Sequence, residues 1–211
     1  MKFKTVEEAR KYRNSLLDFD PENEQECLEK LAQASIYHID MDCMKYIDNP
    51  SKEFCLEAVK RNGYMLKYIK NQTLEICLEA VKQDGLALAY VENQTEEICL
   101  EAIKQNPSAL GYVKDQTPEL CTTAVLLDPY VLEYVKEQTE EICLGAIRRN
   151  PSALVYVINQ TEKLCLEAVS MNGMLLEYVK DQTPEICQAA FDQNDTAILF
   201  VKDLSMVVDN K

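Results

Sequence analysis

The sequence predicts an all-α protein: an α-solenoid of 22-residue αα-hairpin repeats behind an irregular helical N-terminal cap. One observation behind this prediction is a cysteine that recurs every 22 residues without a slip. The second is a pair of helix-capping positions that recur in the same register. The recurring cysteines are Cys55, Cys77, Cys99, Cys121, Cys143, Cys165 and Cys187. A strict period indicates a stack of one structural unit, which offers an extended surface more readily than a catalytic pocket.

Residues 1–49 are expected to form a helical cap that contains one degenerate repeat. The pattern favours two helices in this segment. One covers residues 6–19 and follows the capping residue Thr5, and the other covers residues 20–31 and opens on Asp20-Pro21. Residues 44–47 then resemble residues 66–69, one period later, so part of an extra, irregular copy is present. Terminal copies of a solenoid are expected to be atypical because one of their faces meets solvent.

Seven repeats are expected over residues 50–204, and each holds two helix starts. Counting from the Thr that opens a repeat (Ser51 in the first), position 1 is an N-cap, and an acid usually follows within the first turn. Position 12 is Asn or Asp, and position 13 is Gly or Pro in all but the last repeat. Each repeat should therefore contain a first helix of about ten residues and a second of about eight, with almost no loop between them. Residues 205–211 form a tail or a truncated repeat.

Apolar residues at helical spacing predict which side chains are buried. In the repeat that begins at Thr95 they are Ile98, Cys99, Ala102, Ile103, Ala109, Leu110 and Val113. Position 18 is Tyr in six repeats and Phe200 in the last, and we expect the ring to be buried with its hydroxyl at the edge of the stripe. The Gln at position 22 is expected to bond another such Gln or the exposed ends of adjacent helices. Helices this short persist only by stacking on their neighbours.

Nine cysteines in the chain raise the question of disulfides or zinc, and neither is expected. Equivalent residues of adjacent repeats stand about 9 Å apart, beyond the Cα separation of about 7 Å that a disulfide tolerates. The chain has one His and no Cys-x-x-Cys, so it lacks a zinc site of the usual type. We expect small, reduced core residues, and a cytoplasmic location in the producing cell or an infected host.

Charge and motifs exclude several classes of function. The net charge is −14, with 22 basic and 36 acidic residues, which disfavours direct binding to nucleic acid. No apolar run is long enough to span a membrane. There is no Gly-rich phosphate loop, no His-Glu-x-x-His and no Gly-x-Ser-x-Gly. We expect no enzymatic activity, no metal and no cofactor.

Apolar side chains at positions that are polar or small in the other repeats predict a docking surface for a protein partner. These candidates are Leu126, Leu127, Tyr130, Val155 and Ile158. The alternative is that the two leucines pack beneath a local irregularity. Acids at position 21 are candidate contacts to a basic partner surface, namely Asp115, Glu137 and Asp181. The alternative for these acids is a solvated helical face, and the lysines at position 20 interleave positive charge with them.

The phrase Gln-Thr-x-Glu-Ile-Cys-Leu-Glu-Ala-Val-Lys-x-Asn-Gly-x-x-Leu-x-Tyr-Val-Lys is almost intact over Gln72–Val91 and Gln160–Lys180. It resembles an uncharacterised repeat family of unknown function that occurs in bacteria, protists and large DNA viruses. The resemblance covers residue 50 to about residue 203, and the chain departs from it at Lys163 and over residues 122–127. It implies the repeat fold and a bacterial, phage or viral origin, and it brings no activity, cofactor or functional residue.

The sequence therefore predicts a non-enzymatic protein–protein interaction scaffold or adaptor with an acidic solenoid surface. One alternative is an inhibitor from a phage or mobile element, such as an anti-CRISPR or other anti-defence protein, that occupies the groove of a basic nucleic-acid-handling complex. Another is a purely structural repeat array. Salt should weaken acidic mimicry steeply and leave an apolar contact largely intact, so it separates the first two.

Overall fold

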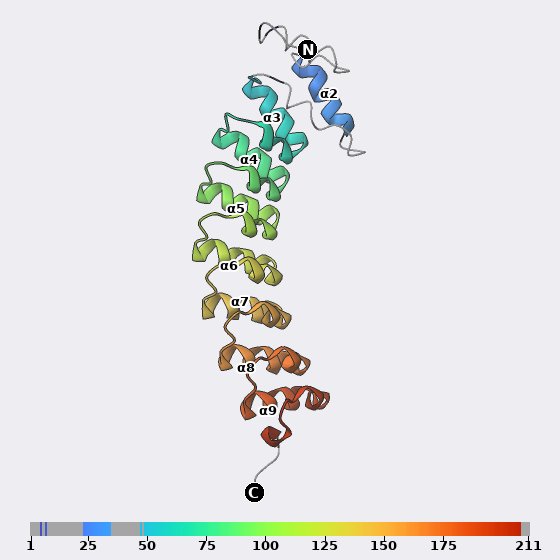
Figure 1. The fold of residues 1–211 in the computed structure, drawn as a ribbon, viewed down its shortest axis with the longest axis vertical. Helices are drawn as coiled ribbons and strands as arrows, with labels where there is room; N and C mark the ends of the chain where they lie inside the picture. The colour runs from blue at the N-terminus through green and yellow to red at the C-terminus, as the bar shows by residue number, and fades with distance from the viewer. Residues whose placement is uncertain (1–4, 6, 8–22, 35–46, 48, 208–211) are drawn as a thin grey trace. The chain divides into compact units, whose positions relative to one another are not determined.

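The computed structural model describes residues 5, 7, 23–34, 47 and 49–207, and the secondary structure in these ranges is helical. The chain divides into two compact units, Met1–Asn106 and Pro107–Lys211, which are drawn in Figure 1 and described here one at a time. The helix expected over residues 6–19 lies almost wholly outside the described residues, as does most of the expected degenerate repeat.

The first unit contains one cap helix followed by alternating α-helices and 3-10 helices (Figure 1). Its elements are α2 (Glu24–Ala34), α3 (Lys52–Arg61), η2 (Gly63–Tyr68), α4 (Leu74–Gln83), η3 (Gly85–Tyr90) and α5 (Glu96–Gln105). The helix expected over residues 20–31 is α2, and it begins later because the side chain of Asn23 accepts a hydrogen bond from the Glu26 amide.

The cap helix is tied to the first repeat by polar contacts at both ends of α3. Ser51 donates from its amide and from its hydroxyl to the two carboxylate oxygens of Glu24, each over 2.6 Å. At the other end, the Arg61 guanidinium donates to the carbonyl of Leu28. Cys27 and Leu28 are buried in this contact. A helix that starts outside the repeat pattern therefore covers the first repeat.

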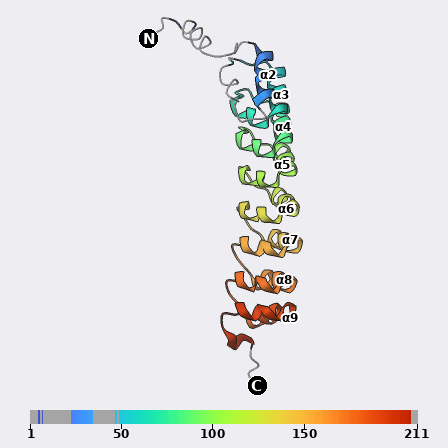
Figure 2. The same cartoon turned by 90° about the vertical axis from the view of Figure 1, so that its right-hand side faces the viewer.

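The second unit continues the same alternation and ends on a short extra 3-10 helix. Its elements are η4 (Pro107–Tyr112), α6 (Pro118–Leu127), η5 (Pro129–Tyr134), α7 (Glu140–Arg149), η6 (Pro151–Tyr156), α8 (Glu162–Met171), η7 (Gly173–Tyr178), α9 (Pro184–Gln193), η8 (Asp195–Phe200) and η9 (Leu204–Val207). Within each unit the α-helices pack against one another in one layer and the 3-10 helices in a second (Figure 2).

The second helix of each repeat is a six-residue 3-10 helix rather than the expected α-helix of about eight residues. In the first repeat Asn62 ends one helix and starts the next, because its amide donates to the Ala58 carbonyl and its side chain accepts from the Tyr64 amide. Six residues later Ile69 is extended, with its amide bonded to the Leu66 carbonyl. The segment between the two extended residues is short, and short helices commonly adopt the tighter 3-10 form.

The predicted caps and core positions are confirmed in the repeats. Thr73 caps α4 by accepting a hydrogen bond from the Ile76 amide over 3.3 Å, and the other α-helices of the array use Ser51 or a Thr in the same way. All seven residues expected to be buried in the repeat that begins at Thr95 are buried. The eight described cysteines are buried, and none of them forms a disulfide with another described residue. The helical repeat solenoid expected from the sequence is therefore the observed fold.

The glutamine at position 22 links each repeat to the next, through helix ends as expected. The Gln138 amide nitrogen donates to the carbonyls of Leu132 and Tyr156, over 3.0 and 2.9 Å. Its amide oxygen accepts from the Ile158 backbone amide over 2.9 Å. The corresponding bonds to the next repeat are made by Gln72, Gln116, Gln160 and Gln182. One side chain thus satisfies the ends of two consecutive 3-10 helices.

Candidate protein-binding surface

The 3-10 layer of the second unit exposes the tyrosine at position 18 in three of its repeats. Tyr112, Tyr134 and Tyr178 have 48%, 40% and 46% of their surface exposed. We expected these rings to be buried, and the structure corrects that expectation. Each Tyr is the last residue of its 3-10 helix, and the following residue, such as Val135, turns inward into the core instead. The ring therefore lies along the surface of the layer.

Rings of this layer contact residues of the neighbouring repeats. The Tyr130 ring meets the Tyr156 ring edge-on, with centroids 6.0 Å apart, and the Tyr130 hydroxyl accepts a hydrogen bond from the Asn150 side chain over 3.0 Å. The Tyr134 ring lies over Gly111, where an added Cβ would come within 3.4 Å of it. A small residue in one repeat thus makes room for the ring of the next.

The ionisation of Tyr134 is affected by the acid next to it and by tyrosines of the adjacent repeats. The pKa of Tyr134 is raised above its usual value, first by a hydrogen bond with the Glu133 carboxylate. Tyr112 and Tyr156, one repeat before and one after, also raise it. We define the tyrosine surface by the exposed and partly exposed residues that these contacts join. They are Tyr112, Tyr130, Tyr134 and Tyr156, and we include with them the exposed Val155, which precedes Tyr156 in η6.

The five apolar candidates from the sequence are all exposed, and the structure divides them between the two layers. Leu126 and Leu127 are 48% and 47% exposed in the last turn of α6, so they do not pack beneath an irregularity. Tyr130 and Val155, at 45% and 47%, lie in η5 and η6 on the tyrosine surface. Ile158 is 60% exposed just after η6, where its amide donates to Gln138 and its carbonyl accepts from the Lys180 side chain.

The three acidic candidates, Asp115, Glu137 and Asp181, are exposed in the segments that lead from a 3-10 helix to the next α-helix. They lie close enough to the core that Glu137 and Asp181 act on the cysteines behind them. The pKa values of Cys121 and Cys165 are raised chiefly by burial, and these two carboxylates add to the effect. These three carboxylates therefore lie where the chain passes from the 3-10 layer to the α-helical layer.

The lysines at position 20 have a structural role that the sequence did not reveal. The Lys136 ammonium donates to the carbonyls of Val113 and Lys114, at the end of the preceding 3-10 helix. Lys180 and Lys202 make the same pair of bonds in later repeats. Cations at helix C-termini are stabilising because they satisfy orphan carbonyls and complement the helix dipole. These ammonium groups are oriented toward the backbone of the preceding repeat.

The α-helical layer is charged, and part of its charge is paired between repeats. Lys163 contacts Glu140 over 2.6 Å, and Arg148 contacts Glu167 over 2.8 Å. Both pairs are exposed, so each contributes little to stability. Exposed apolar side chains occur in both layers of the second unit, for example Leu126 in the α-helical layer and Val155 in the 3-10 layer.

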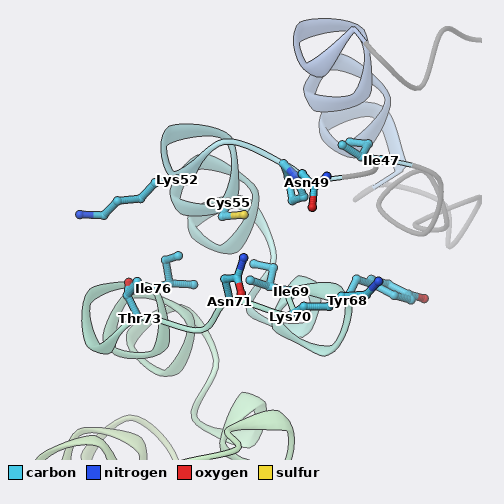
Figure 3. Close-up of a pocket in the computed structure, with 11 residues that line it drawn as sticks. Ile47, Asn49, Lys52, Cys55, Tyr68, Ile69, Lys70, Asn71, Thr73 and Ile76 are labelled. Atoms are coloured by element: carbon cyan, nitrogen blue, oxygen red, sulfur yellow. The ribbon is translucent and has the colours of Figure 1, made fainter.

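A pocket of about 490 Å³ in the first unit was not anticipated from the sequence (Figure 3). It lies beside the first repeat and is lined by Pro50, Cys55, Tyr68, Ile69, Lys70 and Ile76, among others. The signal that could have found it is Pro50, which stands where later repeats have their linking Gln. In the ranges that the structure describes, no cluster of three or more His, Cys, Asp or Glu is arranged to hold a metal ion.

None of the helices within the described residues combines the length and apolar character needed to cross a membrane.

Comparisons with known proteins agree with the repeat architecture. The family model described as Domain of unknown function (DUF4116) matches residues 51–95 and again residues 73–117. The second match begins 22 residues after the first, so each covers two consecutive repeats. No curated protein and no solved structure matches the chain. Over these two overlapping stretches the chain is similar to an uncharacterised repeat family.

Proposed function

We propose that this protein is a non-enzymatic scaffold or adaptor that binds a protein partner through the tyrosine surface of its second unit. The observation that carries the proposal is the exposed Tyr130 ring, which packs edge-on against the half-buried Tyr156, together with the exposed Val155 next to Tyr156 in η6. Tyr is enriched at protein interfaces because it offers a large, rigid contact area together with a hydroxyl. An apolar area of this kind on an otherwise charged protein is typical of a binding site.

The surroundings of the surface indicate what the partner should bring. Glu133 and Glu177 lie next to the exposed Tyr134 and Tyr178 along the chain, and Glu137 follows shortly after. Interfaces commonly combine an apolar centre with a polar rim, and complementary charges across the rim speed association. The partner is therefore expected to present an aliphatic or aromatic anchor with Lys or Arg around it.

The experiment compares the wild-type chain with surface variants as bait in lysate of the host. Val155→Lys copies Lys67, the residue at the same position of the first repeat, and Leu126→Lys copies Lys82. Ser170→Lys, at the position of Leu126 in another repeat, adds the same charge to an exposed site without removing apolar surface. A stoichiometric protein captured by wild type and by the Ser170 variant, and lost with Val155→Lys, supports the proposal. Equal capture by all baits contradicts it.

A second candidate function is an inhibitor, such as an anti-CRISPR or other anti-defence protein, that mimics nucleic acid with its acidic side chains. The net charge of −14 and the exposure of Asp115, Glu137 and Asp181 favour it. Exposed charges are screened at moderate salt, so a partner bound by mimicry is expected to dissociate as salt rises. A salt-resistant partner lost with Val155→Lys supports the adaptor instead.

A further inference from the structure

The residues at positions 17 and 18 recur in a regular row along the 3-10 layer of the second unit. They are the last two residues of each 3-10 helix from η4 to η8, and these helices pack one on the next. Position 18 is Tyr or Phe throughout, and it is exposed or half-buried. Position 17 is exposed in each of these helices, as Gly111, Glu133, Val155, Glu177 and Leu199. Each repeat therefore offers one aromatic ring and one variable exposed position to a ligand.

The step of this row matches one turn of a polyproline II helix. Packed helices stand about 8–10 Å apart, so equivalent residues of consecutive repeats recur at roughly that distance. A polyproline II helix has three residues per turn and rises about 3.1 Å per residue, so every third side chain returns to the same face after about 9 Å. A ligand in this conformation can therefore lie along the layer and present every third side chain to a successive repeat.

The rings at the centre of the row are held in place before a ligand binds. The Tyr156 ring meets the Tyr130 ring edge-on, and the Tyr130 hydroxyl accepts a hydrogen bond from the Asn150 side chain. The Tyr134 ring lies over Gly111 of the preceding repeat. Side chains that are already ordered lose less conformational entropy on binding. Proline-rich segments commonly bind aromatic surfaces, because their extended conformation is also formed in advance.

The charges at position 17 indicate where cations of the ligand should lie. Glu133 and Glu177 are exposed on either side of Val155, and neither acid forms an ion pair with a residue of the described ranges. The two acids are two repeats apart, which is about 16–20 Å. Six residues of a polyproline II helix span about 19 Å. A ligand with cations six residues apart therefore places one at each acid and its middle residue at Val155.

We propose that the partner of this surface binds through a proline-rich segment in the polyproline II conformation, with two Arg residues six positions apart. One Arg contacts Glu133 beside the Tyr134 ring, and the other contacts Glu177 beside the Tyr178 ring. The Pro midway between them packs on Val155 and Tyr156. Arg suits both ends because a guanidinium group binds carboxylates and also stacks on aromatic rings. The inference rests on the proposed function, since it names the class of partner that the same surface binds.

The test titrates the full chain, labelled with ¹⁵N, with acetyl-Arg-Pro-Pro-Pro-Pro-Pro-Arg-amide. This sequence reads the same from either end, so both directions of binding bring an Arg to each acid. We expect saturable shifts of the backbone amides of Val155 and Glu177. Acetyl-Pro-Pro-Arg-Pro-Pro-Arg-Pro-amide has the same composition, but its Arg residues are three positions apart. It should bind about two- to fivefold more weakly, because only one Arg at a time reaches an acid. Acetyl-Arg-Gly-Ser-Gly-Ser-Gly-Arg-amide should bind more weakly still, because it lacks Pro and must be ordered on binding.

Two single variants locate the charge contact. Glu177→Gln should weaken binding of the first peptide about two- to fivefold, the usual effect of losing an exposed ion pair. Glu141→Gln is the matched control, since it removes the same charge from an exposed position of α7 in the other layer, and it should leave the affinity unchanged. The absence of saturable shifts, equal affinity for the peptide with Arg three positions apart, or equal effects of the two variants would overturn the inference.

The peptide titration and the capture from lysate fail in different ways. A protein that is captured by the wild type and lost with Val155→Lys, together with no peptide binding, overturns this inference and leaves the adaptor in place. Equal capture by all baits, together with saturable binding of the first peptide, supports the ligand class and contradicts the adaptor.

Discussion

The backbone amide of Gly63 donates a 2.6 Å hydrogen bond to the side-chain oxygen of Gln83, one repeat further along the chain. Gly85 and Gly173 make the same bond to Gln105 and Gln193. The three remaining pairs at these positions combine a Pro with a residue other than Gln: Pro107 with Leu127, Pro129 with Arg149 and Pro151 with Met171. Because Pro has no amide hydrogen, it needs no acceptor. One array therefore contains two kinds of joint.

Where Gly stands at the contact between two repeats, its backbone packs directly against the backbone of the next repeat. An added methyl group therefore has no room. A Cβ on Gly63 would lie 2.5 Å from the Ala80 carbonyl oxygen, which belongs to the next helix. We expect Gly63→Ala to lower the free energy of unfolding by about 1–3 kcal/mol, the usual effect of overpacking. Urea unfolding followed by circular dichroism measures it.

Gly145→Ala is the matched control for that substitution. Gly145 lies within α7, and a Cβ there would meet nothing within 4 Å. Since Ala is the better helix former, this variant should be as stable as the wild type or more stable by up to about 1 kcal/mol. If both glycine variants were equally stable, close packing at the Gly joint would not be the reason for Gly63.

Removing one linking glutamine should cost more than its half-buried position suggests. Gln138→Ala deletes three hydrogen bonds to backbone groups and the one from the Cys143 thiol, and it leaves the carbonyls of Leu132 and Tyr156 without this partner. We expect a loss of about 2–3 kcal/mol in the free energy of unfolding. Gln188→Ala is the control, because Gln188 is exposed and bonds only Asp192, so its change should stay within about 0.5 kcal/mol. Similar losses for the two variants would contradict the linking role.

Stability should decline at alkaline pH because buried thiols resist ionisation. Burial, with a contribution from Glu24, raises the pKa of Cys55 from 9.0 to about 11. The unfolded chain therefore loses this proton at lower pH than the folded protein. The contribution of the neutral thiol is complete below pH 9.0 and is lost as the pH rises to about 11.

Cys55→Ala isolates that effect from other groups that ionise in the same range. Its deficit in unfolding free energy relative to the wild type should be constant below pH 9.0 and should shrink between pH 9.0 and about 11. Urea midpoints at a neutral and an alkaline pH for both proteins measure the difference. A deficit that did not change with pH would show that Cys55 ionises alike in both states.

The sequence predicted the α-helices and the core closely because capping and burial are local signals. Thr95 caps α5, and Ile98, Ala102 and Ile103 are buried as their spacing indicated. The 3-10 form of η4 could not be predicted in the same way. In a segment as short as Pro107–Tyr112, apolar residues at positions 15, 16 and 19 fit three residues per turn as well as 3.6.

The sequence identified apolar residues of the candidate surface but not the contacts between them. Val155 and Tyr130 could be recognised as apolar because other repeats are polar or small at their positions. The edge-on contact between the Tyr130 and Tyr156 rings depends on how one repeat packs on the next, which a linear pattern does not specify. The pocket beside Pro50 was likewise visible only as a missing Gln. The role of a Gln at this position became clear only from the hydrogen bonds that the other glutamines make.

The most direct test of the proposed function places a photocrosslinking amino acid at residue 155 or, in a separate protein, at residue 170. Both sites are exposed, one on the tyrosine surface and one on α8 in the other layer. After irradiation in host lysate at moderate salt, the account predicts one dominant crosslinked protein at residue 155 and none at residue 170. Crosslinking of the same protein at residue 170 but not at residue 155 would contradict it.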